Sequence, residues 1–154
     1  MKRLSLAGRL GAALLITGIL ATSCIMDWAP IIVYVQVRDS AGNDLLNPGN
    51  EHFLGEKITM TFDGEDYPMQ IPTKYYMPMF SGLELVSRKD FDGWCLTFGE
   101  LDGSENRNDT FTLTWPDGSK DQITFHRTIL TPLIVHDAWR LNGKKTDLPI
   151  HIEK

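Results

Sequence analysis

The chain has 154 residues, of which 15 are Lys or Arg and 20 are Asp or Glu, and its formal net charge is −5 at neutral pH. Nucleic acids and anionic lipid headgroups repel a protein of this sign, so nucleic-acid binding is excluded as a function. Two cysteines, Cys24 and Cys95, allow at most one intrachain disulfide.

Residues 1–23 have the layout of a secretory signal peptide. Lys2 and Arg3 precede an apolar run over residues 10–21, and small residues then lead into Cys24. The apolar run is too short to cross a bilayer comfortably, which disfavours a membrane-spanning helix. We predict cleavage before Cys24, which removes three positive charges and takes the formal charge of the mature chain from −5 to −8.

The end of this segment resembles the lipobox of bacterial lipoproteins, in which the cysteine takes a diacylglyceryl group before cleavage. The pattern prefers Leu three residues before the cysteine, whereas this chain has Ala21 there and Leu20 one step earlier. The resemblance implies lipidation of Cys24. Two or three acyl chains hold a protein firmly, because each buried methylene contributes roughly 0.8 kcal/mol. An ordinary signal peptide, with Cys24 a plain thiol, is the alternative.

Residues 24–30 are expected to form the lipidated cysteine and a short tether, and residues 31–154 a single domain. The six tether residues after Cys24 reach at most ~20 Å when extended, so the domain should sit close to the membrane surface. Once Cys24 is modified, Cys95 has no partner for an intrachain disulfide, and stability must come from packing.

From residue 31 onward the apolar residues alternate with polar ones, which is typical of β-strands. The first predicted strand places Ile31, Val33, Val35 and Val37 on one face. Another strand, over residues 58–62, ends at Asp63-Gly64. This dipeptide predicts a hairpin, because both central residues of a type I′ turn need positive φ. A return strand over residues 67–71 follows.

Two further hairpins are predicted later in the chain. The alternating residues 111–115 lead into Pro116-Asp117-Gly118, a type I turn that starts at Trp115. Asn142-Gly143 marks another turn, and residues 148–152 the last strand, which Pro149 places at a sheet edge. About seven to nine short strands, with turns about every 8 to 12 residues, predict an all-β fold: a single antiparallel β-sandwich, Ig-like or a related barrel.

Metal binding has weak support in the sequence. The histidines, His52, His126, His136 and His151, show no zinc-ligand spacing, and alternation places His126 and His151 on solvated faces. Residues 100–109 offer oxygen ligands for calcium, but their spacing does not match an EF-hand, and solvated turns use the same residue types. The ligand candidates are Glu100, Asp102, Glu105, Asn106, Asn108 and Asp109. We expect no metal and no cofactor, with calcium at this loop left open.

Enzyme signatures are absent: the chain has no Gly-x-Ser-x-Gly elbow, no phosphate-binding glycine loop and no His-Glu-x-x-His motif. Any two of the 20 acids could form a glycosidase pair, so their presence carries no weight. Cys95 lies in a strand-like segment and is expected to be a small packed residue rather than a nucleophile. An undetected hydrolase is the least favoured function.

Aromatic residues are the remaining candidates for a binding site, because rings stack on sugars and suit interfaces. The most suggestive segment contains Tyr75, Tyr76 and Phe80 and is bracketed by prolines and a glycine. As a loop it would expose an apolar patch that needs a partner, whereas as a central strand, the interpretation preferred here, it would be core. Trp94 and Trp115 stand on alternating strands and are expected in the core.

Four segments of the chain, together with the signal, are similar to small lipoproteins of gut Bacteroidota that have no assigned function. They are residues 39–46, 96–103, 111–119 and 139–143. The resemblance implies lipid anchoring, with the outer membrane as the expected site, and no activity. Cys24 is therefore the only functional residue that it supplies. Surface-displayed lipoproteins of that phylum carry a lysine- and acid-rich tag after the cysteine; here only Asp27 fits, so the periplasmic and surface faces both stay open.

The leading hypothesis is a lipid-anchored β-domain of the cell envelope that binds a glycan or a protein without catalysis. The alternative is a structural or assembly component of an envelope protein complex. A glycan-binding domain should expose two or three coplanar aromatic rings on one face. An assembly component should instead present a broad apolar patch or an open strand edge.

Overall fold

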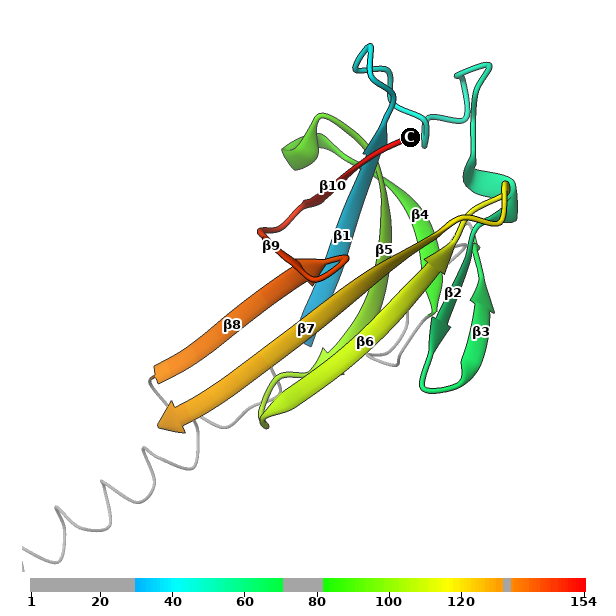
Figure 1. Ribbon diagram of the computed structural model, residues 1–154. Coiled ribbons are helices and arrows are strands. Elements are labelled where there is room, and N and C mark those ends of the chain that lie inside the picture. Colours follow the sequence, from blue (N-terminus) through cyan, green and yellow to red (C-terminus); the bar gives the residue numbers. More distant parts are fainter. Residues whose placement is uncertain (1–29, 71–81, 132–133) are drawn as a thin grey trace, which may run out of the picture.

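Ten strands in two sheets make up the computed structural model, which describes residues 30–70, 82–131 and 134–154 (Figure 1). The four-stranded sheet has the order β10-β1-β5-β4 and the six-stranded sheet the order β3-β2-β6-β7-β8-β9. The predicted all-β sandwich is confirmed. The strands are β1 (Pro30–Arg38), β2 (Thr59–Phe62), β3 (Glu65–Pro68), β4 (Leu83–Arg88), β5 (Gly93–Asp102), β6 (Arg107–Thr114), β7 (Lys120–Thr131), β8 (Ile134–Leu141), β9 (Lys144–Thr146) and β10 (Ile150–Glu153), with 3-10 turns η1 (Gly55–Lys57) and η2 (Lys89–Phe91).

The core lies between the two sheets and is filled by alternate residues of the strands. In β1 these are the predicted Ile31, Val33, Val35 and Val37, all buried. One ring pair joins the sheets, because the centroids of Phe98 on β5 and Phe111 on β6 lie 4.8 Å apart, and a second pair, Phe125 and Trp139 at 4.2 Å, stacks between neighbouring strands of the six-stranded sheet. Trp115 is buried and Trp94 packs, half-buried, against the same core, in line with the expectation for both.

The three predicted turns are confirmed by their backbone geometry. Asp63 and Gly64 have φ values of 51° and 81°, and residues 142–143 have 51° and 80°, as type I′ turns require. The amide of Gly118 donates to the carbonyl of Trp115 at 2.9 Å, which closes the type I turn. The return strand predicted over residues 67–71 is β3, which ends at Pro68.

One strand pair departs from the antiparallel prediction. β10 pairs with β1 in parallel, with Val35 opposite Ile150 and Arg38 opposite Glu153. The predicted last strand also begins two residues later than expected, and the short β9 precedes it. The edge position inferred from Pro149 is correct, because β10 is the outermost strand of its sheet. Alternation in the sequence reports which face is buried, not the direction of the partner strand.

The start of the described chain and the far end of the β7–β8 hairpin lie at the same end of the sandwich (Figure 1). Pro30 pairs with Asp102, immediately before the turn from β5 to β6. That turn is bonded to β7, because the Gly103 carbonyl accepts from Arg127 Nη1 at 2.9 Å and Asn106 Oδ1 accepts from the Ile129 amide at 2.7 Å. We call this end the hairpin end.

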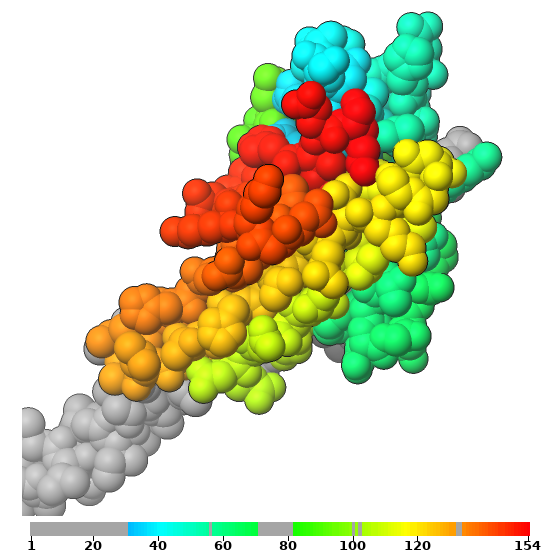
Figure 2. Space-filling model, in the orientation of Figure 1, coloured from blue at the N-terminus to red at the C-terminus, as the bar shows by residue number. Residues whose placement is uncertain are grey.

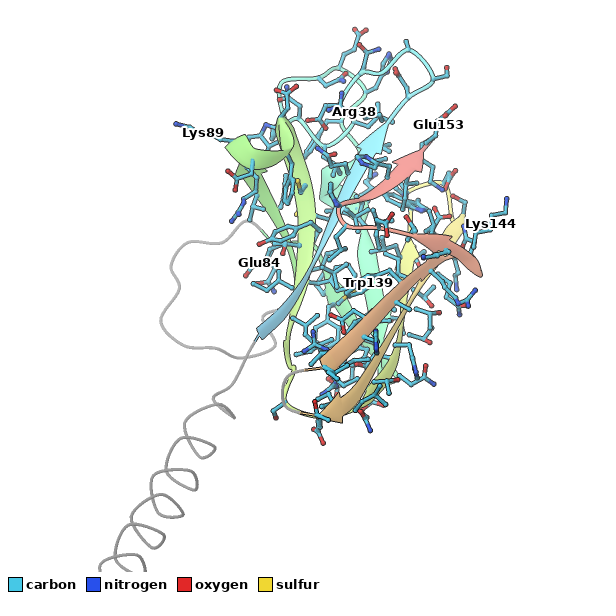
Figure 3. All side chains as sticks on the ribbon, turned by 90° about the vertical axis from the view of Figure 1, so that its left-hand side faces the viewer. Arg38, Glu84, Lys89, Trp139, Lys144 and Glu153 are labelled. Carbon is cyan, nitrogen blue, oxygen red and sulfur yellow. The ribbon has the colours of Figure 1, made fainter. Side chains whose placement is uncertain are left out.

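The opposite end, here called the polar end, consists of residues 39–54, the β6–β7 turn and the C-terminal residue. Lys154 connects them, because its amide donates to the Arg38 carbonyl at 3.0 Å and its Nζ to Ser119 Oγ at 3.1 Å. Figure 3 shows Arg38 and Glu153 at this end of the molecule. The sandwich therefore has two ends of different composition, one close to the start of the domain and one remote from it.

Candidate functional site

The site residues named from the sequence lie outside the described residues. Cys24, with the predicted signal peptide and tether, precedes them, and Tyr75, Tyr76 and Phe80 fall between residues 70 and 82. Lipidation and aromatic binding at these positions stay predictions. The described surface supplies its own candidates, which sequence reasoning did not single out.

The first candidate is the polar end, where residues 39–54 surround an open depression of about 620 Å³. Its lining residues are hydrophilic: Asp39, Asn43, Asp44, Asn47, Gly49, Asn50, Glu51 and His52. Buried Leu45 and Leu46 attach this segment to the core. Such a depression offers mainly hydrogen-bonding groups, so it suits a polar partner rather than an apolar small molecule.

Side chains of the polar end are largely used to hold its own backbone. The Asp39 carboxylate accepts from the amides of Ala41 and Asn43 and from the Asn43 side chain, and these hydrogen bonds lower its pKa. Asp44 accepts from the Leu46 amide and, across the fold, from the Trp94 amide, each at 2.9 Å. The loop is thus fixed before any partner arrives, which reduces the entropy lost on binding.

A second, smaller depression of about 350 Å³ adjoins the first and shares Asp39 with it. It lies between the β1–β10 pair and the turn at residues 39–42. Arg38 closes one side by donating to the Gly42 carbonyl at 3.2 Å and the Asp92 carbonyl at 3.3 Å. His151 stands at this surface between buried Ile150 and Ile152, as alternation predicted. The two depressions together make the polar end a continuous hydrophilic surface.

A cluster around Asp121 is structural rather than a binding site. Its carboxylate accepts from Trp115 Nε1 at 2.7 Å, Asn142 Nδ2 at 2.6 Å and Lys154 Nζ at 2.8 Å. Burial raises the pKa of Asp121, but the hydrogen bonds from Lys154, Asn142 and Trp115 outweigh it, so the pKa is lowered. Protein groups occupy both carboxylate oxygens, so the carboxylate serves the fold rather than a ligand. The cluster joins two turns and the C-terminal residue.

The acidic loop proposed for calcium is shorter than the sequence suggested, because residues 100–102 belong to β5 and residues 107–109 to β6. Asp109 pairs with Arg107 at 2.6 Å, and the Asn106 side chain accepts from the Ile129 amide. The side-chain oxygens of Asp109 and Asn106 therefore form bonds within the fold. Within residues 30–70, 82–131 and 134–154, no three His, Cys, Asp or Glu side chains gather as a metal site.

Cys95 and Thr128, the nucleophile candidates considered among the described residues, do not lie in a catalytic setting. Cys95 is fully buried, and burial together with the nearby Asp44 charge raises its pKa to about 11, so it is a protonated, packed residue as expected. A Thr128 hydroxyl lies 3.0 Å from the His126 ring, but both stand at the surface of β7 rather than in a cleft. The exposure of His126 agrees with the strand alternation.

Aromatic side chains of the described residues are buried or half-buried. On the outer face of the four-stranded sheet, Tyr34 and Phe91 have ring centroids 5.0 Å apart and planes tilted by 54°. The Arg88 guanidinium lies 5.2 Å from the Tyr34 centroid and 5.8 Å from that of Phe91. Tilted rings already covered by an arginine do not form the flat platform that sugar stacking needs.

The third candidate is an exposed apolar group at the end of the β7–β8 hairpin. Leu130, Ile134 and Val135, here called the hairpin tip, expose 64%, 46% and 43% of their surface. Figure 2 shows this part of the hairpin projecting from the body of the molecule. A sequence signal existed: residues 129–135 read Ile-Leu-Thr-Pro-Leu-Ile-Val, an apolar run that does not alternate. Because apolar residues in a strand are usually core, such a run does not by itself indicate exposure.

Comparison with known protein families, with curated proteins and with solved structures gave no match. In the part of the chain that the structure describes, no helix has the length and hydrophobicity that a membrane crossing requires. The geometry of the two ends is therefore the basis for a functional proposal.

Proposed function

We propose that the protein is a lipid-anchored domain of the cell envelope that binds a protein or glycan partner through its polar end, without catalysis. The observation that carries this proposal is the arrangement of the two ends. The chain enters the domain at the hairpin end, and the hydrophilic, internally bonded loops lie at the other end.

The tether sets the orientation of the domain. The segment from Cys24 to Pro30 spans at most ~20 Å, so an anchor on Cys24 keeps the hairpin end near the lipid. β7 runs the length of the sandwich with 12 residues, which corresponds to about 40 Å at about 3.3 Å per residue. The polar end consequently faces away from the membrane, where a partner can reach it.

The chemistry of the polar end favours a hydrophilic partner. Backbone groups bonded to Asp39, Asp44 and Asn50 are ordered in advance, and mainly hydrophilic side chains line the two depressions. A glycan partner depends in addition on Tyr75 and Tyr76, because the described rings form no flat platform. Retardation in affinity gels of soluble polysaccharides, repeated with Tyr75→Ala and Tyr76→Ala, tests this version; no retardation on any glycan leaves a protein partner.

The anchor is tested by metabolic labelling with palmitate. The parent and Cys95→Ala should incorporate label and fractionate with membranes, whereas Cys24→Ser should do neither. Loss of label from Cys95→Ala, or membrane retention of Cys24→Ser with an unacylated terminus, contradicts the proposal.

The binding surface is tested by a photo-crosslinking amino acid placed at Ser40 or Glu51, both exposed at the polar end, with exposed Gln122 on the outer face of β7 as the matched control. We expect adducts of one defined size from positions 40 and 51 and none from position 122. Equal adducts from all three positions, or adducts from 122 alone, contradict recognition through the polar end.

A further inference from the structure

We propose that the hairpin tip is a second membrane contact, which inserts Leu130, Ile134 and Val135 into the boundary between headgroups and acyl chains. The inference rests on the proposed function in one respect, the lipid anchor at Cys24. It adds a protein surface that contacts the bilayer directly and fixes the tilt of the domain relative to the membrane.

The hairpin tip lies beyond the last β6–β7 pair, and the β5–β6 turn reaches along the hairpin only as far as Ile129. The last pair between β6 and β7 joins Arg107 and Arg127, and β7 continues to Thr131 with β8 alone. Four residues of strand extend the hairpin by about 13 Å. The β7–β8 hairpin therefore extends past the start of β6 at this end of the sheet (Figure 1).

The base of the projection is stiff. Arg127 forms a two-point ion pair with Asp137 on the neighbouring strand, at 2.7 Å and 2.6 Å, and also donates to the Gly103 carbonyl. The amide of Ile129 is held by the Asn106 side chain. Strand pairing continues to Thr131 and Ile134, so most backbone groups of the projection are already bonded when it leaves water.

The side chains of the tip have the composition that the interface of a bilayer accepts. Exposed apolar residues gathered on one projection need an apolar partner, unlike single exposed ones. Residues 128–136 contain no acidic side chain, although the mature chain carries a formal charge of −8. The neighbouring Arg127 is neutralised by Asp137. The tip itself therefore adds no negative charge for anionic headgroups to repel.

The position of the tip identifies lipid as its occupant. The described residues begin at Pro30, at the same end of the sandwich, and only five residues separate Cys24 from it. With the acyl chains of Cys24 in the bilayer, the ~20 Å reach of the tether brings the hairpin end against the membrane. A soluble partner would have to occupy the narrow space between the domain and the lipid.

The experiment places an environment-sensitive fluorophore on the full, lipidated protein in vesicles of phosphatidylethanolamine and phosphatidylglycerol. Leu130→Cys carries the label at the tip, and Lys120→Cys carries it at the opposite end of the same strand as the matched control. Cys95 is buried with a raised pKa and does not compete for the label. Nitroxide lipids quench a label in the bilayer, and iodide quenches a label in water.

We expect the label at position 130 to be quenched several-fold more by nitroxide lipids than by iodide, the reverse at position 120, and a loss of lipid quenching when Ile134→Asp is added. Equal behaviour of both positions on an acylated chain overturns this inference and leaves the proposed function intact. Protection from iodide without lipid quenching overturns it in favour of a second copy covering the tip. A bare Cys24 in the mass spectrum of the same preparation overturns both proposals.

Discussion

Asp121→Ala removes the carboxylate on which Trp115, Asn142 and Lys154 converge. The indole N–H of Trp115 belongs to a side chain that is only 3% exposed, so without Asp121 it stays buried and unbonded. A buried donor left in this state costs about 1–3 kcal/mol. Asn142 and Lys154 turn partly to water and add less. We expect a loss of about 3 kcal/mol in unfolding free energy, or about 10 °C in melting temperature.

The same cluster predicts a pH dependence whose sign follows from the lowered pKa of Asp121. The carboxylate holds its proton less well in the folded protein than in the unfolded chain, where its pKa is near 3.8. Its contribution to stability is complete above that value and is lost as the pH falls through the lower, folded pKa. Acidification below pH 3.8 should therefore destabilise the parent more steeply than Asp121→Asn.

Urea denaturation followed by tryptophan fluorescence measures both effects. Asp147→Asn is the matched control, because Asp147 is an exposed carboxylate on the loop before β10, and surface changes of this kind fall within about 0.5 kcal/mol of the parent. If Asp121→Ala falls within that range, or if Asp121→Asn has the same slope with pH as the parent, the reasoning about this cluster is refuted.

Three other predictions concern the core and its borders. Phe111→Ala removes a ring in contact with two others, at centroid distances of 4.6 and 4.8 Å, and should cost about 4 kcal/mol in urea denaturation; a loss under about 2 kcal/mol speaks against this packing. Gly93→Ala should lower the melting temperature more than Gly118→Ala. A Cβ at position 93 would lie 2.7 Å from Asp44 Oδ2, whereas a Cβ at position 118 would meet no surrounding atom within 4 Å. The opposite order of melting temperatures contradicts this geometry. Cys95, with its pKa of about 11, should react with maleimide at neutral pH about 300-fold more slowly than an exposed thiol of pKa about 8.5, and comparable rates would exclude its burial.

Features set by neighbouring residues could be predicted from the sequence. The alternation from Ile31 to Val37 gave the buried face of β1, and the pairs 63–64 and 142–143 gave two turns, since positive φ is a local requirement. The edge position of β10 followed from Pro149 because proline lacks an amide hydrogen.

Features that depend on distant residues could not be predicted. The parallel pairing of Val35 with Ile150 and the bond from the Trp94 amide to Asp44 join segments that no short pattern connects. The hairpin tip illustrates a different failure. Its apolar run was visible, but apolar residues in a strand are expected in the core, and only the structure shows that β7 and β8 extend beyond the strands that could cover them.

The parallel β1–β10 pair has a mechanical consequence under the proposed anchor at the N-terminus. Pro30 lies at one end of the pair and Lys154 at the other, so a force applied between them acts along both strands in opposite directions. Such a force shears the ladder bonds simultaneously, whereas an antiparallel pair pulled from one end would unzip bond by bond. Under the proposed anchor at Cys24, this register makes the domain a stiff link between the membrane and a partner bound at the polar end.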